Sequence, residues 1–218
     1  MSEYQSIFRD EIDYTILDRI KSELFSGYED TIGINLECSN SSNSILDNRF
    51  MFGTWAGPTA KESNLLHEIG HFVEIDDARC HLPDWGLKGG KWIEVCGRYI
   101  NEGMTTKKAV EREIRTIGIA LVLHEHFGLA PMDEDVSDSR YWAEVCQYID
   151  GYYLFKPENY REQDISYKES EKLAFDEIER LILEEKKKWT VEKVYNAWHE
   201  KMKVLIARQK EGCWNDWN

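Results

Sequence analysis

The chain has 218 residues, of which 42% are hydrophobic, and it carries a formal net charge of -14. This length and hydrophobic content are typical of a folded domain with a full core, and they argue against wholesale disorder. The acidic balance repels a phosphate backbone, so we expect no direct binding to nucleic acid and a preference for basic partners.

The sequence contains no signal for a membrane or for secretion. No apolar run approaches the roughly 18 residues of a membrane span, and the N-terminus lacks the basic and apolar regions of a secretion signal. The five cysteines are scattered and show no C-x-x-C spacing. That pattern is typical of reduced thiols rather than of a disulfide framework. We therefore predict a cytoplasmic protein that contacts no membrane; the sequence does not indicate its oligomeric state.

The first predicted elements are a helix and a small sheet. Residues 8–25 place apolar side chains on one face at helical spacing. Residues 31–38 alternate in polarity and residues 49–56 are rich in aromatic side chains, which predicts two strands, with a polar loop over 39–44. We expect a small antiparallel sheet, in which segment 50–55 is the candidate edge strand that receives a substrate backbone. The alternative is that this segment is a core strand.

Residues 67–71 have the spacing H-E-x-x-H, within a helix predicted over residues 60–74. Residues four apart share a helix face, so His67 and His71 can present two imidazoles to one metal ion, for which zinc is favoured. Glu68 lies on the neighbouring side, where it can take a proton from a metal-activated water. The alternative is a buried amphipathic helix whose histidines only form hydrogen bonds.

A third ligand has to come from outside this helix. A third histidine in the extended H-E-x-x-H-x-x-G-x-x-H pattern would need a glycine and a histidine where the chain has Glu74 and Asp77, so that subclass is excluded. Cys80 and His81 are a competing pair of ligands. Because adjacent side chains rarely reach one ion together, we interpret them as loop residues.

A second helix is predicted over residues 106–127, with Gly128 as its stop signal. Glu111 and Glu113 begin its otherwise apolar stretch, and either can turn inward as the third zinc ligand. Alternatively, both are solvated acids that favour the helix dipole. His124, near the end of the helix, is a candidate helper that could donate a hydrogen bond to a developing oxyanion.

The H-E-x-x-H motif, followed by Glu-Arg-Glu at 111–113 and a small, apolar helix, resembles the gluzincin zinc metallopeptidases. It is most similar to the compact ImmA/IrrE-like enzymes of bacteria and phages, whose second helix reads E-x-E-A-N-x-F-A-x-x-L-L-M-P. The resemblance covers about residues 50–127 and places Glu111 at the ligand position, with Glu113 as its substitute. It implies a zinc-dependent peptidase with intracellular protein substrates. The departures from the pattern lie at Ile114, Arg115 and Ile117, and no L-M-P follows.

The rest of the chain is predicted to be helical. An aromatic-rich helix is expected over 139–155, followed by two amphipathic helices over 169–188 and 190–209. The predicted fold class is therefore α+β and mainly helical. Residues 1–135 form a zincin-like metallopeptidase core, and residues 136–218 form a helical C-terminal extension packed on it.

These observations predict a zinc-dependent metallopeptidase that hydrolyses peptide bonds of an intracellular protein, with a protein or peptide substrate that is basic. His67, His71 and Glu111 or Glu113 would bind Zn²⁺, and Glu68 would act as the general base. The alternative is a non-catalytic acidic binding or inhibitor protein with a structural or vestigial zinc site. Such a protein would serve as a regulatory or anti-defence factor and could imitate nucleic acid. A third alternative is a structural helical protein without metal.

Overall fold

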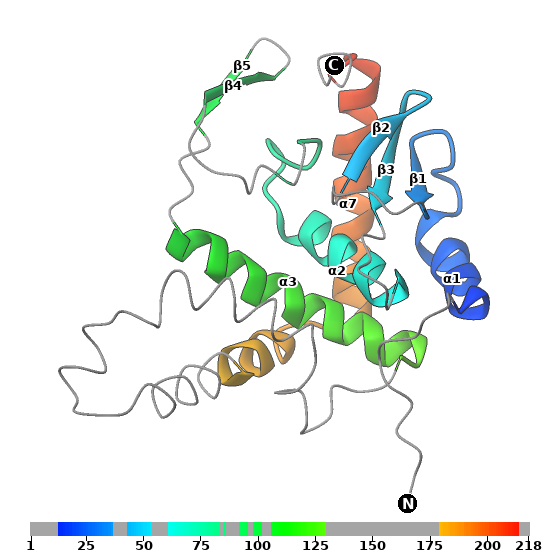
Figure 1. The fold of residues 1–218 in the computed structure, drawn as a ribbon, viewed down its shortest axis with the longest axis vertical. Coiled ribbons are helices and arrows are strands. Elements are labelled where there is room, and N and C mark those ends of the chain that lie inside the picture. Colours follow the sequence, from blue (N-terminus) through cyan, green and yellow to red (C-terminus); the bar gives the residue numbers. More distant parts are fainter. Residues whose placement is uncertain are drawn as a thin grey trace, which may run out of the picture.

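The computed structural model describes residues 13–36, 43–53, 61–82, 85, 92–95, 98–101, 106–129 and 179–213. Its class is α+β and mainly helical, as predicted (Figure 1). The helix expected over 139–155 and the domain boundary expected near 135 lie outside the described residues and stay predictions. The elements are α1 (Tyr14–Ile20), the π-helix η1 (Lys21–Phe25), β1 (Ile32–Asn35), β2 (Asn43–Leu46), β3 (Arg49–Gly53), α2 (Lys61–Glu74), β4 (Trp92–Val95), β5 (Arg98–Asn101), α3 (Thr106–Phe127) and α7 (Val191–Lys210).

Helix α1 begins after the N-cap residue Asp13, and residues 8–12 of the predicted helix lie outside the described residues. The Asp13 side chain accepts hydrogen bonds from the backbone N–H groups of Thr15 and Ile16, at 3.0 and 3.3 Å. These bonds satisfy amides that the first turn of a helix leaves without partners. The helix continues directly into η1, and Gly27 follows in a left-handed conformation at φ 84 that suits glycine.

The sheet is mixed, which corrects the expectation of a wholly antiparallel sheet. β1 pairs parallel with β3, and β2 pairs antiparallel with β3, so the strand order is β1-β3-β2. β3 supplies most of segment 50–55, and it is the central strand with both sides paired. The expectation that this segment is an edge strand is therefore wrong, because its backbone groups already bind β1 and β2. A separate antiparallel hairpin consists of β4 and β5.

Strand β2 begins inside the segment predicted to be a polar loop. Asn43, its first residue, is 2% exposed, and its side chain donates to the Leu82 carbonyl at 3.0 Å. This bond satisfies the amide and allows a polar residue to be buried in a strand. Asp47 and Asn48 join β2 to β3 with φ 50 and 58, as in the two-residue turns that fit the twist of a hairpin.

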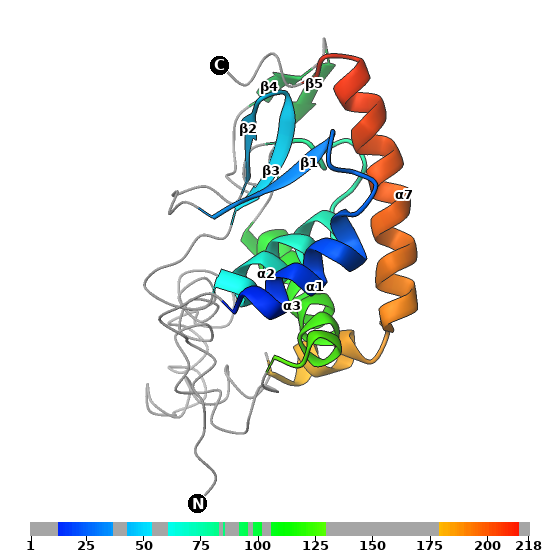
Figure 2. The same cartoon turned by 90° about the vertical axis from the view of Figure 1, so that its right-hand side faces the viewer.

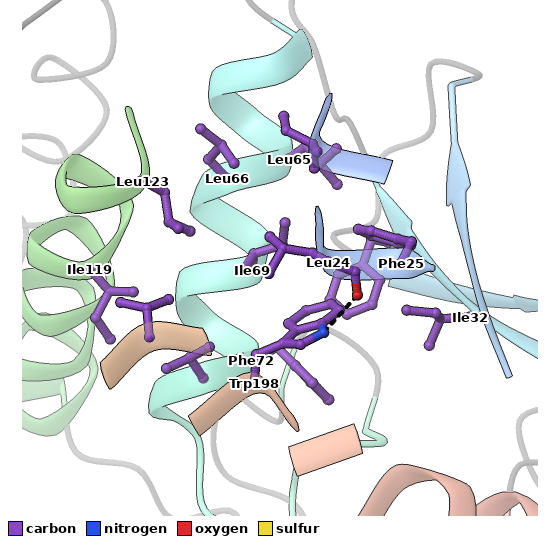
Figure 3. Close-up of a cluster of buried hydrophobic side chains, with 14 of the residues drawn as sticks. Leu24, Phe25, Ile32, Leu65, Leu66, Ile69, Phe72, Ile119, Leu123 and Trp198 are labelled. Atoms are coloured by element: carbon purple, nitrogen blue, oxygen red, sulfur yellow. Dashed lines mark hydrogen bonds between the residues drawn. The ribbon is translucent and has the colours of Figure 1, made fainter. Parts of the chain in front are cut away.

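Helix α2 lies in the centre of the core. Figure 3 shows α3 on one side of it, and η1 and β1 on the other. The apolar residues of α2 point in both directions, and Leu65, Leu66, Ile69 and Phe72 are fully buried. A helix covered on both sides keeps water away from most of its surface, which is the setting expected of the H-E-x-x-H helix.

Helix α7 runs along the helices and the sheet and closes the core from the side (Figure 2). Its N-cap is Thr190, as predicted, whose Oγ1 accepts the Lys193 N–H at 3.3 Å. Trp198 inserts into the aromatic core, and its Nε1 donates to the Leu24 carbonyl at 2.8 Å. The buried face of α7 consists of Val194, Trp198, Met202 and Leu205.

The structure also bears on the predictions about membrane spans and about the cysteines. Within the described part of the chain, no helix combines the length and apolarity needed to cross a membrane. Cys80 is a free, buried thiol, and burial raises its pKa to about 12. Cys213 is disulfide-bonded, so the expectation of reduced thiols is wrong at this position.

Candidate metal centre

Helices α2 and α3 lie side by side and run antiparallel (Figure 1). Near the start of α2, Ser63 is next to His124, and at the end of α2 the Glu74 carboxylate binds Arg115, with 2.5 Å between Oε1 and Nε. Residues in the middle of α2 therefore face the first half of α3. This arrangement brings a residue from the start of α3 to the H-E-x-x-H motif.

The two backbones approach closely at Gly70. A Cβ added to Gly70 would lie 2.7 Å from the Thr116 carbonyl oxygen. Real Cβ atoms do not come this close to a backbone atom, so only glycine fits here without separating the helices. The central glycine of the motif thus sets the distance from which α3 reaches the two histidines.

His67, His71 and Glu113 form one cluster, in which one ligand atom from each lies within 4.8 Å of the others. The His71 Nε2 atom is 3.4 Å from one Glu113 oxygen, and the His67 Nε2 atom is 3.5 Å from the other. Zinc bonds of about 2.0–2.1 Å in tetrahedral geometry separate two ligand atoms by about 3.3–3.4 Å. The donor set could hold a metal ion, and the two histidine–glutamate distances are close to this spacing.

Glu113, and not Glu111, completes the cluster. Glu111 is exposed, whereas Glu113 lies on the face of α3 that continues through the fully buried Ile117 and Ala120. Two residues along a helix correspond to a rotation of about 200°, so the two carboxylates point to opposite sides. The structure therefore reverses the preference for Glu111 that the family resemblance implied.

Thr116 orients one of the two imidazoles. Its Oγ1 lies 3.0 Å from the His71 Nδ1, and both side chains are buried. With Nδ1 bound to the hydroxyl, Nε2 is the nitrogen that faces Glu113. A hydrogen bond on the far nitrogen is how proteins fix the orientation of a metal-binding histidine.

Burial keeps the cluster uncharged when no cation is bound. It raises the pKa of Glu113 to about 8, and the negative charge of Glu74 adds to this effect. Burial lowers the pKa of His67 to about 4, with a further contribution from His124, and it holds the pKa of His71 well below its usual value. The short histidine–glutamate distances are thus not ion pairs at neutral pH. Neutral imidazoles are ready to bind a metal, and a cation would displace the Glu113 proton.

Two ion pairs, Glu74–Arg115 and Asp76–Arg112, connect the end of α2 to the part of α3 next to the cluster. Glu74 binds Arg115, and Arg112 Nη2 lies 2.8 Å from the Asp76 Oδ2 atom just beyond α2. Glu113 is located between these two arginines in the sequence. These ion pairs hold the turn of α3 that carries the candidate ligand. Arg115, at the position where the family pattern has asparagine, forms the ion pair with Glu74.

Glu68 is buried within the core and does not belong to the cluster of ligand atoms. It is 7% exposed, and one of its carboxylate oxygens accepts a hydrogen bond from Trp85 Nε1 at 2.6 Å. No sequence pattern indicated a role for Trp85, which lies beyond the end of α2. No spacing rule relates such a residue to the motif.

The other candidate residues are not among the three residues of the cluster, although His124 is near enough to His67 to affect its pKa. His124 is 4% exposed, and burial lowers its pKa to about 4, an effect that a hydrogen bond with the Ser63 backbone partly offsets. Cys80 and His81 are buried near Arg208 of α7, consistent with their interpretation as residues outside the site. Neither a protein-family model nor a curated protein nor a solved structure matches the chain.

Proposed function

We propose that the chain is a zinc-dependent metallopeptidase that hydrolyses peptide bonds of a protein substrate. The observation that supports this most is the joint position of His67, His71 and Glu113, with ligand atoms within 4.8 Å of one another on two neighbouring helices. Two histidines and a glutamate are a donor set that catalytic zinc sites use. The resemblance of the sequence to gluzincins supports the same proposal.

The ligands in this proposal are the Nε2 atoms of both histidines and the Glu113 carboxylate. Zinc bound there would polarise a substrate carbonyl and lower the pKa of a water molecule. Thr116 fixes the ring of His71, and the Glu74–Arg115 pair holds the ligand-bearing turn of α3. The protein would thus present a rigid set of ligands to the ion.

Glu68 is the proposed general base. It follows His67 directly on α2, so its carboxylate belongs to the turn that carries the first ligand. Its surroundings are buried, where a proton transfer is not in competition with bulk water. Glu68 would take a proton from the attacking water and give it to the nitrogen of the leaving amine.

An extended substrate would have to bind at an edge of the sheet. Strand β3 is already paired on both sides and cannot accept a peptide. The edges of this three-stranded sheet are β1 and β2. Strand addition at either of them would hold a peptide through its main chain and leave specificity to side-chain pockets.

Metal content and turnover together test the proposal. Purified protein is analysed for zinc next to His67→Ala and Glu113→Gln, with Glu111→Gln as the matched control. We expect one equivalent of zinc in the natural chain and in Glu111→Gln, and loss in the other two. Absence of zinc from the natural chain after zinc is supplied would refute the proposed site.

Peptidase activity is then measured with a library of unstructured peptides. We expect cleavage by the zinc-loaded protein and none by Glu68→Gln, which keeps its metal because Glu68 is not a ligand. Zinc binding without cleavage, together with a basic partner that stays intact and copurifies, would favour the non-catalytic binding protein instead.

A further inference from the structure

We propose that Trp85 is a positioning residue for Glu68: its indole N–H holds the carboxylate of the general base in a fixed direction. This inference rests on the proposed function. It concerns a residue that no sequence motif includes. The starting observation is the hydrogen bond of 2.6 Å from Trp85 Nε1 to Glu68 Oε2.

The bond lies in a dry environment. Trp85 is 0% exposed and Glu68 is 7% exposed. A short hydrogen bond to a carboxylate is stronger than one between neutral groups, and low local polarity strengthens it further. The bond therefore restricts the rotation of the Glu68 side chain, which would otherwise have three side-chain torsions to vary.

The indole itself is held on several sides by aromatic rings. Its centroid is 5.4 Å from Phe50, 5.8 Å from Phe52 and 5.9 Å from Phe72. These rings come from β3 and α2, so the sheet and the motif helix enclose Trp85 together. The indole also stacks on the ring of His71, with 6.4 Å between centroids and 25° between planes. One side chain thus contacts both the proposed base and a proposed ligand.

The backbone of Trp85 has an unfavourable conformation. Its φ is 56, in the left-handed region that a bulky residue rarely adopts. Strain of this kind persists where the surroundings hold the residue in place, and it is concentrated at functional sites. Here the strained backbone delivers the indole N–H to Glu68.

Trp198 gives a contrast within the same core. It is also 0% exposed and its Nε1 also donates a hydrogen bond, but the acceptor is the backbone carbonyl of Leu24 (Figure 3). This bond connects α7 to η1 and touches no residue of the site. Trp198 is therefore the matched control for the loss of a buried indole N–H.

A hydroxamate probe measures the position of the base without any peptide substrate. Acetohydroxamic acid chelates zinc through its two oxygens and gives a proton to a nearby carboxylate. Its affinity therefore depends both on the bound zinc and on the position of the Glu68 carboxylate. Its binding to the full-length, zinc-loaded protein is measured by calorimetry for Trp85→Phe, Glu68→Gln, the double variant and Trp198→Phe.

We expect Trp85→Phe to weaken hydroxamate binding about tenfold, the typical weight of one charge-assisted hydrogen bond. The effect should vanish in the Glu68→Gln background, because Trp85 acts through Glu68. Trp198→Phe should leave the affinity unchanged. An unchanged affinity in Trp85→Phe, or an equal loss with and without Glu68, would overturn the inference. Failure of the natural chain to bind zinc would overturn the proposed function as well.

A second measurement needs neither metal nor a tryptophan variant. In protein labelled with ¹⁵N at the indole nitrogens, the Trp85 N–H proton should resonate downfield because it binds a carboxylate. Glu68→Gln should move this resonance upfield by removing the charge and leave that of Trp198 in place. If no indole resonance responds to Glu68→Gln, the contact is absent and the inference is wrong.

Discussion

The Oγ1 atom of Thr116 lies 3.0 Å from Nδ1 of His71, the ring nitrogen opposite to the one that is 3.4 Å from Glu113. Thr116 and Glu113 are three residues apart on α3, so they share a face of the helix. One helix thus supplies a candidate ligand and also the group that orients a ligand of the neighbouring helix. A small rotation of α3 would disturb both contacts together.

Thr116→Val should weaken zinc binding by about ten- to a hundredfold, the usual effect of losing the hydrogen bond on a metal-binding histidine. Valine has nearly the same shape as threonine, so the packing of α2 against α3 is preserved. The dissociation constant is measured by competition with a chromophoric chelator. Thr116→Ser keeps the hydroxyl and should bind zinc like the natural chain; equal losses in both variants would contradict the orienting role.

Gly70→Ala should destabilise the fold and disrupt the metal centre together. The added methyl group would be 2.7 Å from the Thr116 carbonyl oxygen, so α2 and α3 have to separate, at a cost of about 1–3 kcal/mol. Gly118→Ala is the control, since its methyl group would meet Glu185 and Lys186 at 3.0 Å, on another face of α3. It should lower the melting temperature but leave zinc affinity intact. Loss of zinc in both variants would mean that general loosening, and not the Gly70 contact, controls the site.

The sequence predicted the long helices α2, α3 and α7 well, because their periodic pattern and their terminal residues agree. Helix α3 has the predicted bounds of 106–127, and Gly128 follows it at φ 75. The sheet was harder to predict. β2 begins with Asn43, a polar residue that can be buried because its side chain donates a hydrogen bond to the Leu82 carbonyl. No local sequence pattern reveals this long-range bond. The adjacent residues Asp47-Asn48 were the signal that could have indicated a hairpin.

The candidate site was predictable up to the third ligand. The H-E-x-x-H spacing places two histidines on one helix face regardless of the rest of the fold. The choice between Glu111 and Glu113 depends on how α3 is rotated about its axis. Packing determines this rotation, because Gly118 faces Glu185 and Lys186 while Thr116 faces Gly70 of α2. The role of Trp85 could not be predicted, since its contact with the motif depends on tertiary packing that no local sequence pattern specifies.

Glu23 should contribute to stability in a pH-dependent manner. Burial raises its pKa, but hydrogen bonds from His126 and Tyr195, at 2.6 and 2.5 Å, outweigh this, and the pKa lies below its usual value of 4.5. A group whose pKa is lower in the folded protein stabilises the fold above the unfolded pKa, and this stabilisation is lost as the pH falls through the folded pKa.

Glu23→Gln should therefore lower the free energy of unfolding by about 1–2 kcal/mol at neutral pH. The difference from the natural chain should shrink as the pH falls below 4.5 and through the lower pKa of the folded state, because the carboxyl is then protonated in both states. Urea unfolding at several pH values measures it. Glu200→Gln, which removes an exposed pair with Lys203, should have no such effect. A difference that is constant with pH would contradict the ionic role of Glu23.

Glu113→Gln should have opposite effects on stability without and with zinc. In the metal-free protein the pKa of Glu113 is raised to about 8 by burial and by Glu74, from a usual value of 4.5. Between these values the folded state binds a proton that the unfolded state has released, so the carboxyl costs stability as the pH rises, by at most about 1.4 kcal/mol per pH unit. Glutamine carries no such cost.

With a chelator present, Glu113→Gln should thus raise the melting temperature at pH 7, and the gain should vanish near pH 4.5. The titrations of His67 and His71 occur in both proteins, so the difference between the two isolates Glu113. With zinc present the order should reverse, because the natural carboxylate binds the ion and glutamine binds it poorly. The exposed Glu111→Gln should change neither curve. A metal-free Glu113→Gln protein that is less stable than the natural chain at pH 7 would contradict this prediction. It would show that the Glu113 carboxyl does not destabilise the metal-free fold.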